Sequence, residues 1–140
     1  MSEESTTQDL ITIVHRSVEA MNRRDVDTLA SFFALDAVWD LSPMGLGTYG
    51  PRPAIRAFLE EWIGSYEWFE LVLEEVVGLA GGVVFAVVVQ HGRLPGSGGE
   101  LDMRYASVNS GVDGRFERVT NYTDINEARA AAERLAEERG

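Results

Sequence analysis

Three side chains in the C-terminal half of the chain could carry out proton-transfer chemistry together. His91 is one of only two histidines and titrates near neutral pH, so it could act as a general base. Tyr105 and Asn121 could then donate hydrogen bonds to a developing oxyanion. The alternative is that His91 is a partly solvated residue at a strand end with no catalytic role, because the sequence shows no carboxylate that would orient its ring. The sequence leaves both interpretations open.

The position of His91 depends on alternation along a strand, in which every second residue shares a face. Residues 83–91 (VVFAVVVQH) form an apolar run that ends in two polar residues. The two faces are Val84, Ala86 and Val88 on one side, and Phe85, Val87, Val89 and His91 on the other. Both sets are apolar, so both faces should be covered. We expect the set with His91 to line a cavity and the other set to form a homodimer contact on the outer sheet face.

The same alternation predicts further residues that line the cavity. They are Trp39, Met103, Tyr105 and Asn121, joined by Ser17 from the first helix. Trp39, Tyr49 and Trp62 could stack on a flat ligand, or they could be ordinary core aromatics. The sequence does not choose between these two roles.

Several other chemistries lack the residues that they need. The chain has two histidines and no cysteine, with no His-x-x-x-His or Glu-x-x-His spacing, so we expect no dedicated metal site. A Gly-x-Ser-x-Gly nucleophile elbow is absent. The glycine-rich residues 94–99 join two strands and do not lead into a helix, so they are not a phosphate cradle. We therefore expect no cofactor.

Composition and charge limit the partners of the chain. Its 140 residues fit a single domain over 1–140, and the hydrophobic share of 45% is typical of a globular protein. A formal charge of −11 disfavours nucleic acid and anionic membranes. Residues 1–7 show no signal-peptide pattern and are expected to be a flexible N-terminus. Together with the lack of cysteine, this predicts a cytoplasmic protein.

The first half of the chain shows helical spacing. Residues 8–23 have an apolar stripe with a period of 3.6 residues. Asp25 can cap a second short helix, in which Phe32 and Phe33 would point inward. Residues 37–41 predict a brief strand, and residues 42–50 a loop rich in glycine and proline. Pro51 or Pro53 would start a third helix, whose buried stripe includes Phe58 and Trp62.

The second half of the chain switches to strand patterns. Strands are predicted over 68–76, 83–91, 100–109 and 115–123, separated by glycine-rich turns. Asp124 with Glu127 resembles a capping box and would open a terminal helix with an alanine stripe. Helices followed by a strand meander indicate an α+β fold. We expect a curved antiparallel sheet, shaped as a cone and wrapped over three N-terminal helices, plus a C-terminal helix.

Several segments in this order resemble the SnoaL-like group of the nuclear transport factor 2-like superfamily. They are Asn22-Arg23-Arg24-Asp25, Asp36-Ala37-Val38-Trp39-Asp40, Tyr49-Gly50, Ala54-Ile55-Arg56-Ala57-Phe58, Asp113-Gly114-Arg115-Phe116 and Asn121-Tyr122-Thr123-Asp124. The resemblance covers nearly the whole chain and implies a cone with an internal cavity. Its relatives include ketosteroid isomerases, limonene epoxide hydrolases, polyketide cyclases and non-catalytic binding modules, so function must be argued from the cavity.

The catalytic groups of these relatives do not carry over directly. In the isomerase comparison, the family's tyrosine, base and protonated acid fall on Ser17, Leu41 and near Tyr105. Asp40 could replace Leu41 as the base only if its strand bulges, because one residue along a strand reverses the face. In the epoxide-hydrolase comparison, the catalytic positions fall on Trp39, Leu41, Asn121 and near Val87 and Val89, where none can act as an acid or base.

Three functional hypotheses follow from the sequence. The first is a protein that binds a small hydrophobic or aromatic molecule inside the cone. The second is an isomerase, cyclase or epoxide hydrolase that uses His91 with Tyr105 and Asn121. The third is a non-catalytic dimeric interaction module. Under the first hypothesis, the residues expected to contact the ligand are Ser17, Trp39, Leu41, Tyr49, Phe58, Trp62, Val87, Val89 and Met103.

Overall fold

The structure, a computed structural model, describes residues 3–96 and 99–140. Its helices are α1 (Glu3–Asn22), α2 (Val26–Ser31), the 3-10 helix η1 (Ser42–Met44), α3 (Arg52–Gly64) and α4 (Ile125–Arg139). Its strands are β1 (Phe33–Asp40), β2 (Thr48–Tyr49), β3 (Trp68–Leu79), β4 (Val83–Arg93), β5 (Leu101–Val112) and β6 (Arg115–Tyr122). Residues 1–2 of the expected flexible N-terminus lie outside the described residues. Helix α1 begins at Glu3, before the predicted start at residue 8.

Two helix starts follow directly from local sequence. The Asp25 side chain accepts a hydrogen bond from the Thr28 backbone N–H at 3.1 Å, and the Asp124 side chain accepts one from the Glu127 N–H at 3.0 Å. Each cap satisfies a backbone donor that the first helical turn leaves unpaired. Both caps confirm the sequence prediction. Helix α2 ends at Ser31, however, so Phe33 opens strand β1 and is not part of that helix.

The six strands form one sheet in the order β2-β1-β6-β5-β4-β3. Strands β3 to β6 are the predicted antiparallel meander, and the α+β class is confirmed. Two details differ from the expectation. Strand β1 runs parallel to β6, and the short edge strand β2 pairs with β1 inside the segment that was predicted to be a loop.

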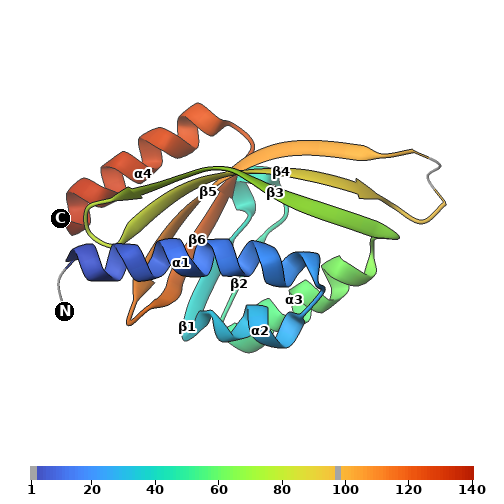
Figure 1. The fold of residues 1–140 in the computed structure, drawn as a ribbon, viewed down its shortest axis with the longest axis horizontal. Coiled ribbons are helices and arrows are strands. Elements are labelled where there is room, and N and C mark those ends of the chain that lie inside the picture. The colour runs from blue at the N-terminus through green and yellow to red at the C-terminus, as the bar shows by residue number, and fades with distance from the viewer. Residues whose placement is uncertain (1–2, 97–98) are drawn as a thin grey trace.

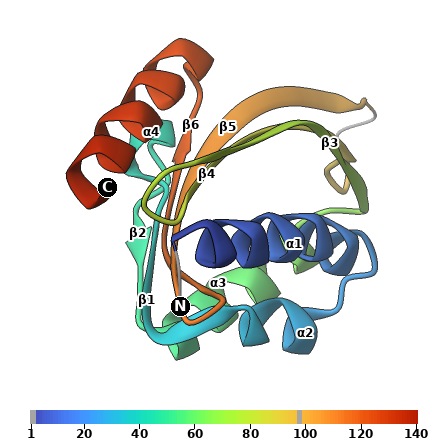
Figure 2. The ribbon, with the colours of Figure 1, turned by 60° about the vertical axis from the view of Figure 1, so that its left-hand side comes forward.

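The sheet separates two cores. Figure 1 shows α1 along one face of the sheet and α4 on the opposite face. In Figure 2 strands β3 to β5 arch over α1, while α2 and α3 lie below it. The inner core packs α1, α2 and α3 into the concave face. The outer core lies beneath α4 and contains Val83, Phe85, Val87, Ala106, Val108, Ala128, Ala132 and Ala136.

The faces of β4 are the reverse of the prediction. Val84, Ala86 and Val88 belong to the inner core, whereas Phe85 and Val87 pack under α4. Because both sets are apolar, their periodicity could not show which face was inside. The expected dimer contact through the first set is therefore wrong, since those side chains are buried inside the domain.

Helix α4 lies close to the sheet because its contact stripe is made of alanines. Ala128 and Ala132 are fully buried against β4 and β5. Arg139 fixes the end of the helix, donating from Nε to the Gly81 carbonyl at 2.7 Å and from Nη2 to the Gly111 carbonyl at 3.0 Å. Gly81 has φ +75°, and a Cβ there would stand 2.6 Å from Arg139 Cβ. This turn therefore requires glycine.

Candidate functional site

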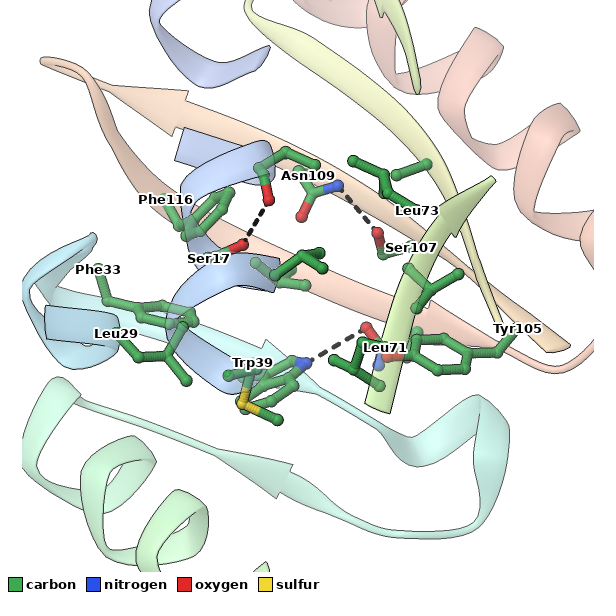
Figure 3. A pocket seen from close by; sticks show the side chains of 17 residues that line it. Ser17, Leu29, Phe33, Trp39, Leu71, Leu73, Tyr105, Ser107, Asn109 and Phe116 are labelled. Atoms are coloured by element: carbon green, nitrogen blue, oxygen red, sulfur yellow. Dashed lines mark hydrogen bonds between the residues drawn. The ribbon is translucent and has the colours of Figure 1, made fainter. Parts of the chain in front are cut away.

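A hollow lies between α1 and the concave face of the sheet. We call it the inner hollow; its volume is about 90 Å³. Its lining is mostly aliphatic and aromatic: Val14, Val18, Met21, Leu29, Phe33, Trp39, Leu71, Leu73, Ala86, Val88, Phe116 and Val119. The polar members are Ser17, Tyr105, Ser107, Asn109 and Asn121. Figure 3 shows how these side chains converge from the helix and from several strands.

A smaller compartment of about 40 Å³ adjoins the inner hollow. Four residues, Met21, Trp39, Tyr105 and Asn121, line both spaces and so form their shared wall. The other residues around the small compartment are Leu41, Met44, Leu46, Phe58, Trp62, Gln90 and Met103. Among the described residues, neither lining includes a charged side chain.

Strand β5 supplies three of the polar groups by alternation. Tyr105, Ser107 and Asn109 all point to the concave side, and β6 places Asn121 directly opposite Ser107. The Asn109 amide donates to Ser107 Oγ at 3.0 Å and to the Val84 carbonyl at 3.1 Å. These bonds offset the cost of burying an amide in an apolar space.

Trp39 and Asn121 are joined across the shared wall. The indole Nε1 donates to Asn121 Oδ1 at 3.2 Å, shown as the dashed line from Trp39 in Figure 3. An indole N–H can only donate, so it fixes the orientation of the amide and leaves Nδ2 as the free end. Among the described residues, no partner of Asn121 Nδ2 or of the Tyr105 hydroxyl is present.

Tyr105 is a neutral donor in this wall. Burial raises the pKa of Tyr105 far above its ordinary value, and the nearby Tyr66 adds to the shift. Removing water from around a phenolate disfavours the charged form. The hydroxyl therefore keeps its proton and can donate a hydrogen bond into the hollow.

Most of the predicted contact residues line these two spaces. Ser17, Trp39, Leu41, Phe58, Trp62, Met103, Tyr105 and Asn121 do so. Tyr49 does not; its ring stacks on Phe58 with centroids 4.1 Å apart, and its hydroxyl donates to the Leu46 carbonyl. Val87 is buried under α4, and Val89 shares the outer face with it. For Val87 and Val89 the expected cavity position is wrong, because the two faces of β4 are the reverse of the prediction.

His91 lies on the outer face, so its expected place in the cavity wall is also wrong. Its ring is 37% exposed, and Nδ1 lies 2.7 Å from Asp102 Oδ1 on the neighbouring strand. The hydrogen bond with Asp102 raises the pKa of His91 against a smaller opposing effect of burial, and the charges of Asp102, Glu70 and Glu100 raise it further. A carboxylate that orients the ring therefore exists, but it holds the ring away from the hollow.

Asp40 does not reach the hollow either. Its Oδ1 accepts hydrogen bonds from the Ser42 N–H at 2.9 Å and from the Thr48 hydroxyl at 3.0 Å, and Oδ2 accepts one from Arg118 at 2.9 Å. Burial alone would raise the pKa of Asp40, but these hydrogen bonds and the Arg118 charge hold it below its ordinary value. The register of β1 does shift, between Phe33 and Val38, yet Asp40 remains a residue that organises the loop.

The sequence reasoning missed three polar lining residues, namely Ser107, Asn109 and Gln90. Ser107 and Asn109 follow Tyr105 at steps of two, so extending the same alternation along β5 would have found them. Gln90 pairs with Met103 in the register of β4 and β5, and its amide donates to the Tyr66 hydroxyl at 2.9 Å. It was missed because His91 was taken to mark the inner face.

Neither a metal centre nor a membrane span is found in the part of the chain that the structure describes. No group of three or more His, Cys, Asp or Glu residues there could hold a metal ion. No helix among the same residues is long and apolar enough to cross a membrane.

Comparison with known proteins agrees with this architecture. The family described as the SnoaL-like domain matches residues 14–119. The chain belongs to the SnoaL-like family. No curated protein sequence matches it. The match begins within α1 and ends within β6, so it covers most of the elements around the inner hollow but stops before Asn121.

Solved structures with the fold of this SnoaL-like domain include two proteins with enzyme names. A putative polyketide cyclase from Xanthomonas campestris pv. campestris is 28% identical, with a TM-score of 0.69, covering 91% of this chain and 98% of its own. An LEH-like epoxide hydrolase from M. tuberculosis is 18% identical, with a TM-score of 0.71 and 91% coverage of both chains.

A third structure with this fold contains a small molecule. It is TerC, co-crystallised with polyporic acid. TerC is 18% identical to the SnoaL-like domain described here, with a TM-score of 0.72, covering 89% of this chain and 98% of its own. At this identity the likeness establishes the fold alone.

Proposed function

We propose that this SnoaL-like protein binds an uncharged, hydrophobic or aromatic small molecule in the inner hollow. The observation that carries the proposal is the lining: apolar side chains surround a few neutral hydrogen-bonding groups, with no charged side chain among the described residues. Binding sites for small molecules commonly combine an apolar wall with a few placed polar groups. A charged ligand would lose its hydration there without gaining a counter-charge.

The polar groups of the shared wall define how such a ligand would be held. Tyr105 and Asn121 line both compartments, and their side chains offer the hydroxyl and Nδ2 as hydrogen-bond donors. We infer that a ligand oxygen, such as a carbonyl or an ether, accepts hydrogen bonds here while its apolar body occupies the hollow. The volumes of about 90 and 40 Å³ favour a compact molecule.

The enzymatic hypothesis loses its base in this geometry. His91 was to abstract a proton beside Tyr105 and Asn121, but its ring is on the opposite face of the sheet. A general base must lie within hydrogen-bond reach of the proton that it removes. Binding is therefore the better-supported function. Polyketide cyclase or epoxide hydrolase chemistry would appear as a new product in the ligand experiment.

The experiment exposes the protein to uncharged ketones, epoxides and aromatics, each paired with a carboxylate of similar shape. Thermal unfolding measures binding, and mass spectrometry follows each compound. A ligand at 100 times its dissociation constant should stabilise the fold by about 2.7 kcal/mol. An unchanged ligand mass indicates a binder, and a new product indicates an enzyme.

Three variants make this experiment specific. Ala86→Leu fills the hollow from β4 and should remove the stabilisation, whereas Val72→Leu adds volume at an exposed position of β3 and should retain it. Tyr105→Phe removes one donor and should weaken binding about tenfold, as expected for a lost hydrogen bond of about 1.4 kcal/mol. Stabilisation that persists in Ala86→Leu, or that is equal for the paired carboxylates, would contradict the proposal.

The homodimer and the cytoplasmic location remain predictions from the sequence. The outer sheet face beyond α4 presents Val72, which is 45% exposed, beside Val89 on the next strand. These residues replace the set that was first expected at the dimer contact. Light scattering over a concentration series tests this contact, and a monomer at every concentration would exclude it. An interaction module without ligand binding would show association but no stabilisation in the ligand panel.

A further inference from the structure

A second recess lies on the opposite side of the sheet, between α4 and the outer face of β5 and β6. Its volume of about 240 Å³ exceeds that of the inner hollow. The residues around it are Val108, Ser110, Arg118, Thr120, Tyr122, Ala131, Arg134, Leu135 and Glu138. It shares none of them with the inner hollow or the small compartment.

The recess forms because the contact stripe of α4 rests on β4 and β5. Its fully buried alanines leave the flank of α4, with Ala131, Arg134 and Leu135, beside the outer face of β6. On the sheet, the cross-strand pairs Val108–Thr120 and Ser110–Arg118 form the floor. The lining thus joins an apolar part to a polar part made of hydroxyl and guanidinium groups and the Glu138 carboxylate.

Two arginines and three hydroxyls of the recess have donors that no described residue uses. Arg118 donates to Asp40 Oδ2 at 2.9 Å, which uses one of its five N–H groups. Arg134 makes no ion pair or hydrogen bond with any residue that the structure describes. The same holds for the side-chain hydroxyls of Ser110, Thr120 and Tyr122 within the described chain.

Two arginines line the recess from different elements, Arg134 on α4 and Arg118 on β6. Burial raises the pKa of Tyr122, and the carboxylates of Glu127 and Asp40 raise it further, while Arg134 and Arg118 lower it. Tyr122 lines the same recess as both arginines, and Glu127 and Asp40 oppose their charge there. Opposing charges are present: Asp40 is paired with Arg118, and Glu138 lies at the recess on α4.

We propose that this recess is a binding site for a small organic carboxylate with a compact apolar body. The carboxylate accepts hydrogen bonds from Arg134 and from the spare N–H groups of Arg118, with the three hydroxyls around it. Guanidinium groups suit a carboxylate because their paired N–H groups match its two oxygens. The apolar body lies on Val108, Ala131 and Leu135. This site accepts an anion, whereas the inner hollow excludes one, so the two proposals stand independently.

The test uses benzoate as the probe and benzamide as its uncharged match, added to the full chain. Isothermal titration calorimetry measures affinity, and backbone amide NMR shifts locate the site. Benzoate should saturate one site and shift the amides of Thr120, Tyr122 and Ala131. Benzamide should bind at least about tenfold more weakly, because it lacks the charge that strengthens bonds to guanidinium.

Variants separate the recess from general charge effects. Arg134→Gln should weaken benzoate binding about tenfold. Arg16→Gln removes the same charge from an exposed position on α1 and should leave affinity within about twofold. Ala131→Phe should abolish benzoate binding by filling the recess. If Ala131→Phe does not fold, Arg118→Gln provides a second test, because it removes the other guanidinium group and should also weaken benzoate binding. Tyr105→Phe, which alters the inner hollow, should leave benzoate affinity unchanged.

Three results would overturn the proposal. One is an absence of saturable benzoate binding to the wild-type chain. Another is equal weakening by Arg134→Gln and Arg16→Gln, which would indicate nonspecific attraction. The third is a set of NMR shifts confined to residues of the inner hollow. A failure of the uncharged ligand panel, in contrast, would leave this site unaffected.

Discussion

The two faces of β4 and β5 are both buried where helices cover them, but they are differently filled. Beneath α4, Phe85 and Val87 pack against alanines of the helix and border neither the inner hollow nor the recess beside α4. Beneath α1, Ala86 and Val88 border a hollow of about 90 Å³ that also contains hydroxyls and amides. Burial alone therefore does not distinguish a structural core from a candidate site. The size of the facing side chains, and the presence of neutral polar groups among them, do.

The largest expected contrast comes from removing one phenylalanine on each face. Phe85→Ala should lower the free energy of unfolding by about 3–5 kcal/mol, because its ring is 1% exposed inside the outer core. Phe116→Ala should cost at least about 1 kcal/mol less, since Phe116 already borders open space. Urea denaturation of both variants measures the difference. An equal or larger loss for Phe116→Ala would show that the inner hollow is packed as tightly as the outer core.

The reverse experiment enlarges one alanine on each face. Ala132 and Ala86 are both 0% exposed, but only Ala86 borders the hollow. Ala132→Leu should destabilise the fold by about 1–3 kcal/mol through overpacking, while Ala86→Leu should change stability by less than about 1 kcal/mol. The same denaturation series measures both. Similar losses in the two variants would mean that the apparent space beside Ala86 cannot accept a side chain.

A smaller effect separates the inner hydrogen bond from an outer ion pair. Trp39→Phe removes the donor to Asn121 and should cost about 0.5–1.5 kcal/mol. Arg104→Gln breaks the exposed pair with Glu74 on the outer face and should give no resolvable change, because water screens it. Thermal unfolding of the two variants provides the measurement. A greater loss of stability in Arg104→Gln than in Trp39→Phe would show that the outer ion pair contributes more than the inner hydrogen bond.

The smallest effect concerns the titration of His91 on the outer face. Its pKa is raised by Asp102, so the protonated pair stabilises the fold below the ordinary histidine value of 6.5. This contribution is lost as the pH rises through the raised folded-state pKa. An NMR titration of the imidazole should show that raised pKa, and Asp102→Asn should lower it. Glu19→Gln, at an exposed position of α1, should leave the pKa of His91 unchanged. A wild-type pKa at or below 6.5 would contradict the pairing.

Local chemistry explains why much of the fold could be predicted. Asp25 and Asp124 cap helices through bonds to residues three positions along, so the signal lies within a few letters of sequence. The edge strand at Thr48–Tyr49 was not predictable in this way, because it exists only through pairing with Asp40 and Trp39.

The candidate site was predicted in part, for a reason that lies in β4. Trp39, Tyr105 and Asn121 do line the hollow, as the alternation along their strands predicted. In β4 both faces are apolar, and only the helices packed on them decide which is inside. The polar residue at its end, His91, was therefore a misleading marker, since strand-end histidines occur on either face of a sheet.

The neutrality of the hollow has a consequence for how acidity affects its contents. None of its described lining residues is a carboxylate, histidine or arginine, and Tyr105 keeps its proton well into alkaline solution. The charge of the whole molecule changes steeply as its 23 acidic residues gain protons, yet the hollow does not take part. A neutral compound enclosed there would be retained equally in mildly acidic and mildly alkaline surroundings, for as long as the domain stays folded.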